Sequence, residues 1–159
     1  MSDNHGFTLL EILIAIAIMM LLLGGGIAAY LRLDKRQTLV NAGKEVELLL
    51  RTAQKKAQVG DRPKTGCAHL EGYRVVPPPA GGRTLTLRAV CDTGLVTVQT
   101  YDLPTGVTLT NMGTMTFAVL HGGVSGATSV RLDVNNPSYT YTFLVTAGGE
   151  IGDVQIIKN

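Results

Sequence analysis

Near its start the chain has a long apolar run. From Ile12 to Leu31 only Tyr30 carries a polar group, and a charged stretch follows at once: Arg32, Asp34, Lys35 and Arg36. These twenty residues would span roughly 30 Å as an α-helix, which is about the thickness of the hydrocarbon core of a bilayer. The pattern therefore predicts one membrane-spanning helix.

Beyond the charged stretch the pattern stays helical but becomes amphipathic. Apolar or small residues recur at alternating steps of four and three: Leu39, Gly43, Val46, Leu50, Ala53 and Ala57. Charged residues occupy the other faces: Lys44, Glu45, Glu47, Arg51, Lys55 and Lys56. This spacing predicts a single apolar stripe that packs on a sheet. Since Gly60, Asp61 and Pro63 give a clear stop, we expect one helix from Thr8 to about Gln58.

From Cys67 onward the hydrophobic period changes to two. Apolar and polar residues alternate in four segments, separated by turns rich in Gly, Pro and Asn: residues 84–91, 96–99, 129–134 and 139–145. Alternation of this kind is typical of half-buried antiparallel strands. The sequence therefore predicts an α+β protein, with a long N-terminal helix (membrane half plus amphipathic half) packed on an antiparallel β-sheet globular domain.

Charge and reactive side chains exclude several functions. The 14 basic and 12 acidic residues give a net charge of +2, too balanced to imply that this chain alone binds nucleic acid. No nucleophile motif or phosphate-binding loop occurs, and no ligand motif includes the histidines His5, His69 and His121. Three oxygen-bearing residues could contact calcium, although a solvated turn is the commoner use of such a cluster: Asp133, Asn135 and Asn136. We expect no catalytic site, no metal and no cofactor.

Two ordinary explanations of the apolar run are a secretory signal peptide and a simple signal anchor. A signal peptide has a basic start and a short apolar region; here no Lys or Arg precedes Gly6, and the run is too long, although Gly26-Ile27-Ala28 could serve as a cleavage site. A simple anchor does not explain Glu11, since a carboxylate costs about 2.5–3.5 kcal/mol at the centre of a membrane helix, and less near its end. The alternative for Glu11 is an acid close enough to the start of the helix to reach the lipid headgroups.

A third explanation accounts for Glu11. The segment Gly6-Phe7-Thr8-Leu9-Leu10-Glu11, at the head of a bilayer-length apolar run, resembles the class III signal of type IV prepilins and type II secretion pseudopilins. The resemblance implies that a prepilin peptidase cuts after Gly6 and methylates the new N-terminal amine of Phe7. It also implies that Glu11 meets the terminal amine of a neighbouring subunit, where each charge offsets the other in lipid.

Two features depart from the family's usual pattern. The leader lacks Lys and Arg, whereas basic residues follow the apolar run, which runs against the positive-inside rule. Ala28 lies near the position where many pilins have a helix-kinking proline, just after Gly24, Gly25 and Gly26. Each Gly lowers helix propensity by about 1 kcal/mol relative to Ala. We predict that this triplet is a weak point of the helix; close helix–helix packing through small residues is the alternative.

The part of the sequence after the helix leads to two further expectations. The segment from Met115 to Ile157 resembles minor pseudopilins and minor pilins of the GspH/FimT type, which initiate or cap filaments. Cys67 and Cys91 are the only cysteines, so they can form one disulfide if the domain lies in an oxidising compartment, or remain two buried thiols.

Together these features predict a non-enzymatic filament subunit. Its expected parts are a leader (1–6), a transmembrane and filament-core helix (7–33), an amphipathic extension (34–59) and an extracytoplasmic β-rich domain (60–159). The expected partners are other pilin subunits, prepilin peptidase, the inner-membrane assembly platform and, before assembly, the lipid bilayer. The alternative is a non-polymerising, membrane-anchored extracytoplasmic domain that binds a ligand through loops such as Asp102–Gly106.

Overall fold

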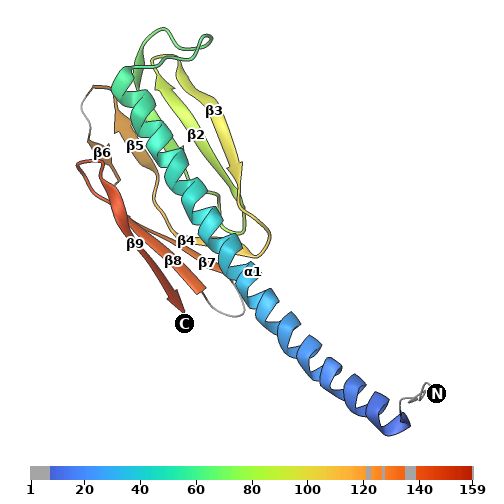
Figure 1. Cartoon of the computed structure of the whole chain (residues 1–159). Helices are drawn as coiled ribbons and strands as arrows, with labels where there is room; N and C mark the ends of the chain where they lie inside the picture. Colours follow the sequence, from blue (N-terminus) through green and yellow to red (C-terminus); the bar gives the residue numbers. More distant parts are fainter. Residues whose placement is uncertain (1–7, 121–122, 127, 135–138, 159) are drawn as a thin grey trace, which may run out of the picture. The chain divides into compact units, whose positions relative to one another are not determined.

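The computed structural model describes residues 8–120, 123–126, 128–134 and 139–158, apart from the side chain of residue 28. Over this part of the chain it contains one helix, α1 (Leu9–Val59), followed by strands alone (Figure 1). The strands are β1 (Leu70–Val76), β2 (Thr84–Cys91), β3 (Gly94–Asp102), β4 (Val107–Asn111), β5 (Met115–Ala118), β6 (Val124–Ser125), β7 (Ser129–Val134), β8 (Tyr139–Val145) and β9 (Ile151–Lys158). The chain divides into two compact units, Met1–Lys35 and Arg36–Asn159, which are described separately below.

Helix α1 ends where the sequence predicts. Gly60 has a φ of 64°, a left-handed conformation that glycine adopts without the steric penalty of a Cβ. Its N–H donates to the carbonyl of Ala57 (3.2 Å), and the N–H of Asp61 donates to that of Lys56 (3.0 Å). These two bonds form a Schellman motif, which satisfies carbonyl groups that the last helical turn leaves open.

The strands of the second unit form two antiparallel sheets. Sheet A has the order β3-β2-β1-β5-β6, and sheet B has the order β4-β7-β8-β9. The amphipathic half of α1 lies across these sheets (Figure 1). The predicted α+β class is confirmed, but the strands divide between two sheets, a feature that the sequence pattern does not reveal.

The core of this unit lies between the helix and the inner faces of the sheets. Every residue of the predicted stripe is buried, and Ala42 and Leu49 are buried as well. Burying a leucine side chain stabilises a fold by roughly 1.5–3 kcal/mol. At Gly43 a Cβ would lie 2.4 Å from ring carbons of Tyr141, so the aromatic ring packs directly on the helix backbone. The helix face is therefore broader than the single stripe that the spacing predicts.

Two predicted positions differ in the structure. Val98, expected on the buried face of its strand, is 37% exposed, because the pairing shifts from Leu87↔Gln99 to Arg88↔Thr97 and leaves Val98 as the extra residue of a bulge. Glu47, expected on a charged face, has a side chain only 13% exposed.

Candidate functional site

The cleavage and methylation residues predicted from the sequence, Gly6 and Phe7, lie outside the described residues. The described residues begin at Thr8, which caps α1. The backbone N–H of Glu11 donates to the Thr8 hydroxyl (3.3 Å), and the N–H of Ile12 donates to the Thr8 carbonyl (3.3 Å). Thr8 therefore acts as the N-cap, and Thr8 with Glu11 three residues later matches the spacing of a capping box. This role of Thr8 is not among the predictions from the sequence, although the T-x-x-E spacing signals it.

Glu11 lies in the first turn of α1. Its negative charge is favourable there, because the helix dipole places partial positive charge at the N-terminus; the effect is worth about 0.3–1 kcal/mol at exposed positions. A shallow groove of about 300 Å³ runs along the helix from Glu11 and is otherwise apolar, with Ile12, Ala15, Ile16 and Met19 as its lining. Glu11 thus places one carboxylate at the end of an apolar surface.

The apolar side chains of the first unit are exposed. Every described side chain from residue 8 to residue 35 is exposed within the chain, with values such as 76% for Leu9 and 78% for Leu21. By length and composition, α1 is long and apolar enough to cross a membrane. Side chains of this kind, exposed along a bilayer-length helix, need lipid or other helices as their environment.

The glycine triplet lies within the continuous helix. A Cβ built at Gly24, Gly25 or Gly26 would meet no atom within 4 Å. No contact with the described part of this chain therefore requires these residues to be small. This openness is compatible with both a weak point in the helix and close packing by another helix, and the role of the triplet stays a prediction.

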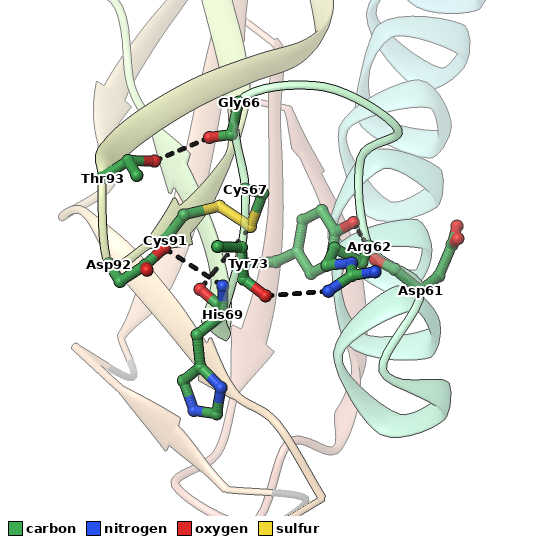
Figure 2. Close-up of a disulfide and its surroundings, with 10 residues drawn as sticks. Asp61, Arg62, Gly66, Cys67, His69, Tyr73, Cys91, Asp92 and Thr93 are labelled. Carbon is green, nitrogen blue, oxygen red and sulfur yellow. Dashed lines mark hydrogen bonds between the residues drawn. A yellow bond between two sulfur atoms is a disulfide. The ribbon is translucent and has the colours of Figure 1, made fainter.

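In the second unit the two cysteines form a disulfide. Cys67 and Cys91 are joined, with their Cα atoms 5.3 Å apart (Figure 2). Hydrogen bonds fasten the same two segments: the N–H of His69 donates to the Asp92 carboxylate (3.1 Å), and the Thr93 hydroxyl donates to the carbonyl of Gly66 (2.7 Å). Donation from the backbone N–H of His69 also lowers the pKa of Asp92. The loop after α1 is thus tied to the β2–β3 turn.

The other end of this loop is tied to the helix and to β1. The Tyr73 hydroxyl donates to the carbonyl of Asp61, whose carboxylate pairs with Lys56. Burial raises the pKa of Tyr73, and the hydrogen bond to Asp61 raises that of Lys56. Figure 2 shows these residues together with the disulfide; Tyr73 itself lies on β1. We call the loop, residues 60–69, the clasped loop.

Asp133, a possible calcium ligand, accepts hydrogen bonds from neighbouring side chains of the protein. Burial disfavours ionisation of Asp133, but hydrogen bonds from Thr110 (2.6 Å), Thr140 (2.6 Å) and Arg131 (3.1 Å) outweigh it and lower its pKa. Asn135 and Asn136, the other candidate ligands, lie outside the described residues. Within the described part of the chain, no group of three or more His, Cys, Asp or Glu side chains could hold a metal ion.

Comparison with known proteins identifies the amino-terminal segment. Residues 1–27 match the family described as the prokaryotic N-terminal methylation motif. No curated protein and no solved structure matches the chain. The match supports a type IV prepilin-like protein, as the sequence predicts. The motif suggests a structural subunit, and together with the apolar helix it fits a single-pass, membrane-anchored protein. Membership of the GspH/FimT type stays a prediction.

Proposed function

We propose that this chain is a pilin-like structural subunit, cut after Gly6 by prepilin peptidase, methylated at Phe7 and assembled into a pilus or pseudopilus. One observation carries the proposal: the methylation motif stands at the head of a helix whose first half, up to residue 35, exposes every described side chain. Lipid covers these side chains before assembly, and the helices of other subunits cover them afterwards. Neither environment is supplied by the chain itself.

Glu11 is proposed to set the register of assembly. Glu11 lies at one end of the apolar groove lined by Ile12, Ala15, Ile16 and Met19. A neighbouring subunit's terminal amine is costly in lipid, and so is the Glu11 carboxylate, so pairing lowers the cost of both. Because one helix end meets a different part of the next subunit, the contact is head-to-tail and grows as an open helix.

The remaining parts follow from this assignment. Residues 1–6 would be the leader, 7–33 the filament-core helix, 34–59 the amphipathic extension and 60–159 an extracytoplasmic domain. The Cys67–Cys91 disulfide supports a location outside the cytoplasm, because disulfides persist in oxidising compartments. The subunit would wait in the inner membrane until the assembly platform extracts it.

The first test is the intact mass and N-terminal sequence of the full chain produced together with its prepilin peptidase. A mature chain that begins at a methylated Phe7 is expected. Replacement of Gly6 by a bulkier residue should leave the uncut chain in the membrane. A chain that still begins at Met1 beside an active peptidase would contradict the proposal and favour a simple membrane anchor.

A second test separates assembly from insertion. Glu11→Ala should insert into the membrane normally but enter sheared filaments less efficiently, because the terminal amine of the next subunit loses its partner. Glu11→Asp, which keeps the charge, should be less affected. Glu45→Ala is a matched control on an exposed part of the same helix. Unchanged incorporation of the Glu11→Ala chain would remove the proposed role of this residue.

A further inference from the structure

A row of hydrogen-bond donors crosses the outer face of sheet A, on the side away from the core. Arg88 on β2 lies opposite Arg74 on β1 and opposite Thr97 on β3. Arg74 in turn lies opposite Thr116 on β5, which lies opposite Ser125 on β6. Directly paired residues share one face of a sheet, so hydroxyl groups flank two adjacent guanidinium groups.

The two arginines sit side by side without acidic partners. The ion pairs formed among the described residues involve neither Arg74 nor Arg88. Asp102 shares their face, but it lies opposite Thr84, four residues from Arg88 along β2, or about 13 Å away. Like charges directly opposite each other destabilise a sheet. An anion bound between them would remove this repulsion.

One hydrogen-bond donor in this row lacks an acceptor. The Nε–H of Arg88 is buried and has no hydrogen-bond acceptor among the described residues, whereas the Nε–H of Arg74 donates to the Thr116 hydroxyl (3.2 Å). A buried donor without an acceptor is costly and rare in folded proteins. The Nε–H and one terminal N–H of a guanidinium form a fork that matches two oxygens of a carboxylate, phosphate or sulfate group.

The row also has an apolar border. Two residues further along the strands, and so on the same face, lie Leu95, Val90, Gly72 and Ala118. Gly72 cannot carry a side chain, because a Cβ there would lie 2.4 Å from the carbonyl oxygen of Phe117. Gly72 is itself buried, whereas Arg74 and Arg88 are only half-buried, so part of each arginine side chain stays accessible to a ligand.

We propose that Arg74 and Arg88 form a binding site for an oxyanion, whose two oxygens accept from the guanidinium groups while the neighbouring hydroxyls supply further donors. The ligand class is a carboxylate, phosphate or sulfate group. The site lies on the strands of the second unit and uses no residue of the amino-terminal motif.

The test follows the Nε–H signals of the full-length, ¹⁵N-labelled protein in detergent micelles by NMR. Sodium sulfate, sodium phosphate, sodium acetate and sodium chloride are added at matched ionic strength. We expect saturable shifts of the Arg88 and Arg74 signals with at least one oxyanion and no saturable shift with chloride. Stronger binding of acetate would indicate a carboxylate ligand, and stronger binding of phosphate or sulfate a tetrahedral one. Non-saturating shifts, or equal shifts with chloride, would overturn the proposal.

Variants then assign the binding to the fork. Arg88→Gln and Arg74→Gln should each weaken binding by about tenfold or more, since each removes charge-assisted hydrogen bonds. Arg88→Lys keeps the charge but not the fork and should also weaken binding; undiminished binding would show simple charge attraction and contradict the proposed geometry. Arg83→Gln is the control, because Arg83 bonds to Thr105 outside the row, and this change should leave binding as it is. The backbone amide spectrum confirms that each variant is folded.

Discussion

The amino-terminal unit exposes its apolar side chains, whereas the globular unit buries most of them. Along the first unit the large apolar side chains are 45–78% exposed. In the second unit the inward-facing residues of the helix and of both sheets are almost completely buried. A surface that its own chain leaves uncovered must be completed by lipid or by other molecules. The proposed assembly function therefore belongs to the first unit, and the stability of the fold to the second.

Two glutamates on the same helix make the contrast at the level of single residues. The Glu47 carboxylate accepts from the Tyr141 hydroxyl and lies 3.9 Å from the guanidinium of Arg51. The Glu11 carboxylate forms no ion pair within the described residues. Glu47 is thus satisfied by its own chain, whereas the charge of Glu11 stays available to a partner from outside. This difference assigns a structural role to Glu47 and supports an assembly role for Glu11.

The largest expected effect comes from making the same truncation in each unit. Leu50→Ala should lower the free energy of unfolding by about 2–5 kcal/mol, because it leaves a cavity between helix and sheets; Leu50 is fully buried. Leu22→Ala, at a side chain 71% exposed, should leave unfolding unchanged but reduce incorporation into filaments. Chemical denaturation of the full chain in detergent, followed by circular dichroism, measures the first effect.

A control on the same helix sharpens this result. Leu48 is 57% exposed, so Leu48→Ala should change the free energy of unfolding by less than about 0.5 kcal/mol. Equal losses from Leu50→Ala and Leu48→Ala would contradict the packing described for the second unit.

The sequence predicts local features of both units well. The alternation in β2, β7 and β8 locates these strands, and the three-and-four spacing from Leu39 to Ala57 identifies the buried helix face. Gly60 marks the helix end. Each of these features depends on the chain's own neighbouring residues, through side-chain periodicity or backbone conformation.

Features that depend on distant partners were not predictable. Alternation says which side of a strand is buried, but not which strands pair, so the division into two sheets does not follow from it. The burial of Glu47 depends on Tyr141, which is 94 positions away in the chain. The pairing of Arg74 with Arg88 likewise depends on strand register. At the amino terminus the T-x-x-E spacing was available, and the capping role of Thr8 could have been found.

The second prediction concerns the disulfide that holds the clasped loop. Replacing both Cys67 and Cys91 by Ser should lower the free energy of unfolding by about 3 kcal/mol, because the unfolded chain loses a covalent loop closure; the two residues are 24 positions apart. A reducing agent should destabilise the natural chain by a similar amount and leave the serine variant unchanged. Membrane insertion, which depends on the first unit, should be the same for both chains. Identical denaturation midpoints with and without reductant would show that the disulfide adds no stability.

The smallest effect concerns the hydrogen bond between the helix and sheet B. Burial, with the hydrogen bond to Glu47, raises the pKa of Tyr141 from its ordinary value of 10.0. Tyr141→Phe should lower the free energy of unfolding by about 1.5 kcal/mol at neutral pH, because the mostly buried Glu47 carboxylate loses a donor.

Above about pH 10 the unfolded chain releases the phenolic proton of Tyr141 while the folded chain retains it, so the contribution of Tyr141 to stability falls as pH rises. Burial also raises the pKa values of Tyr73 and Tyr101, but these groups titrate in both proteins. Denaturation of the two proteins at pH 8 and above pH 10 should therefore give a difference in stability that shrinks at the higher pH, and a constant difference would show that Tyr141 titrates normally.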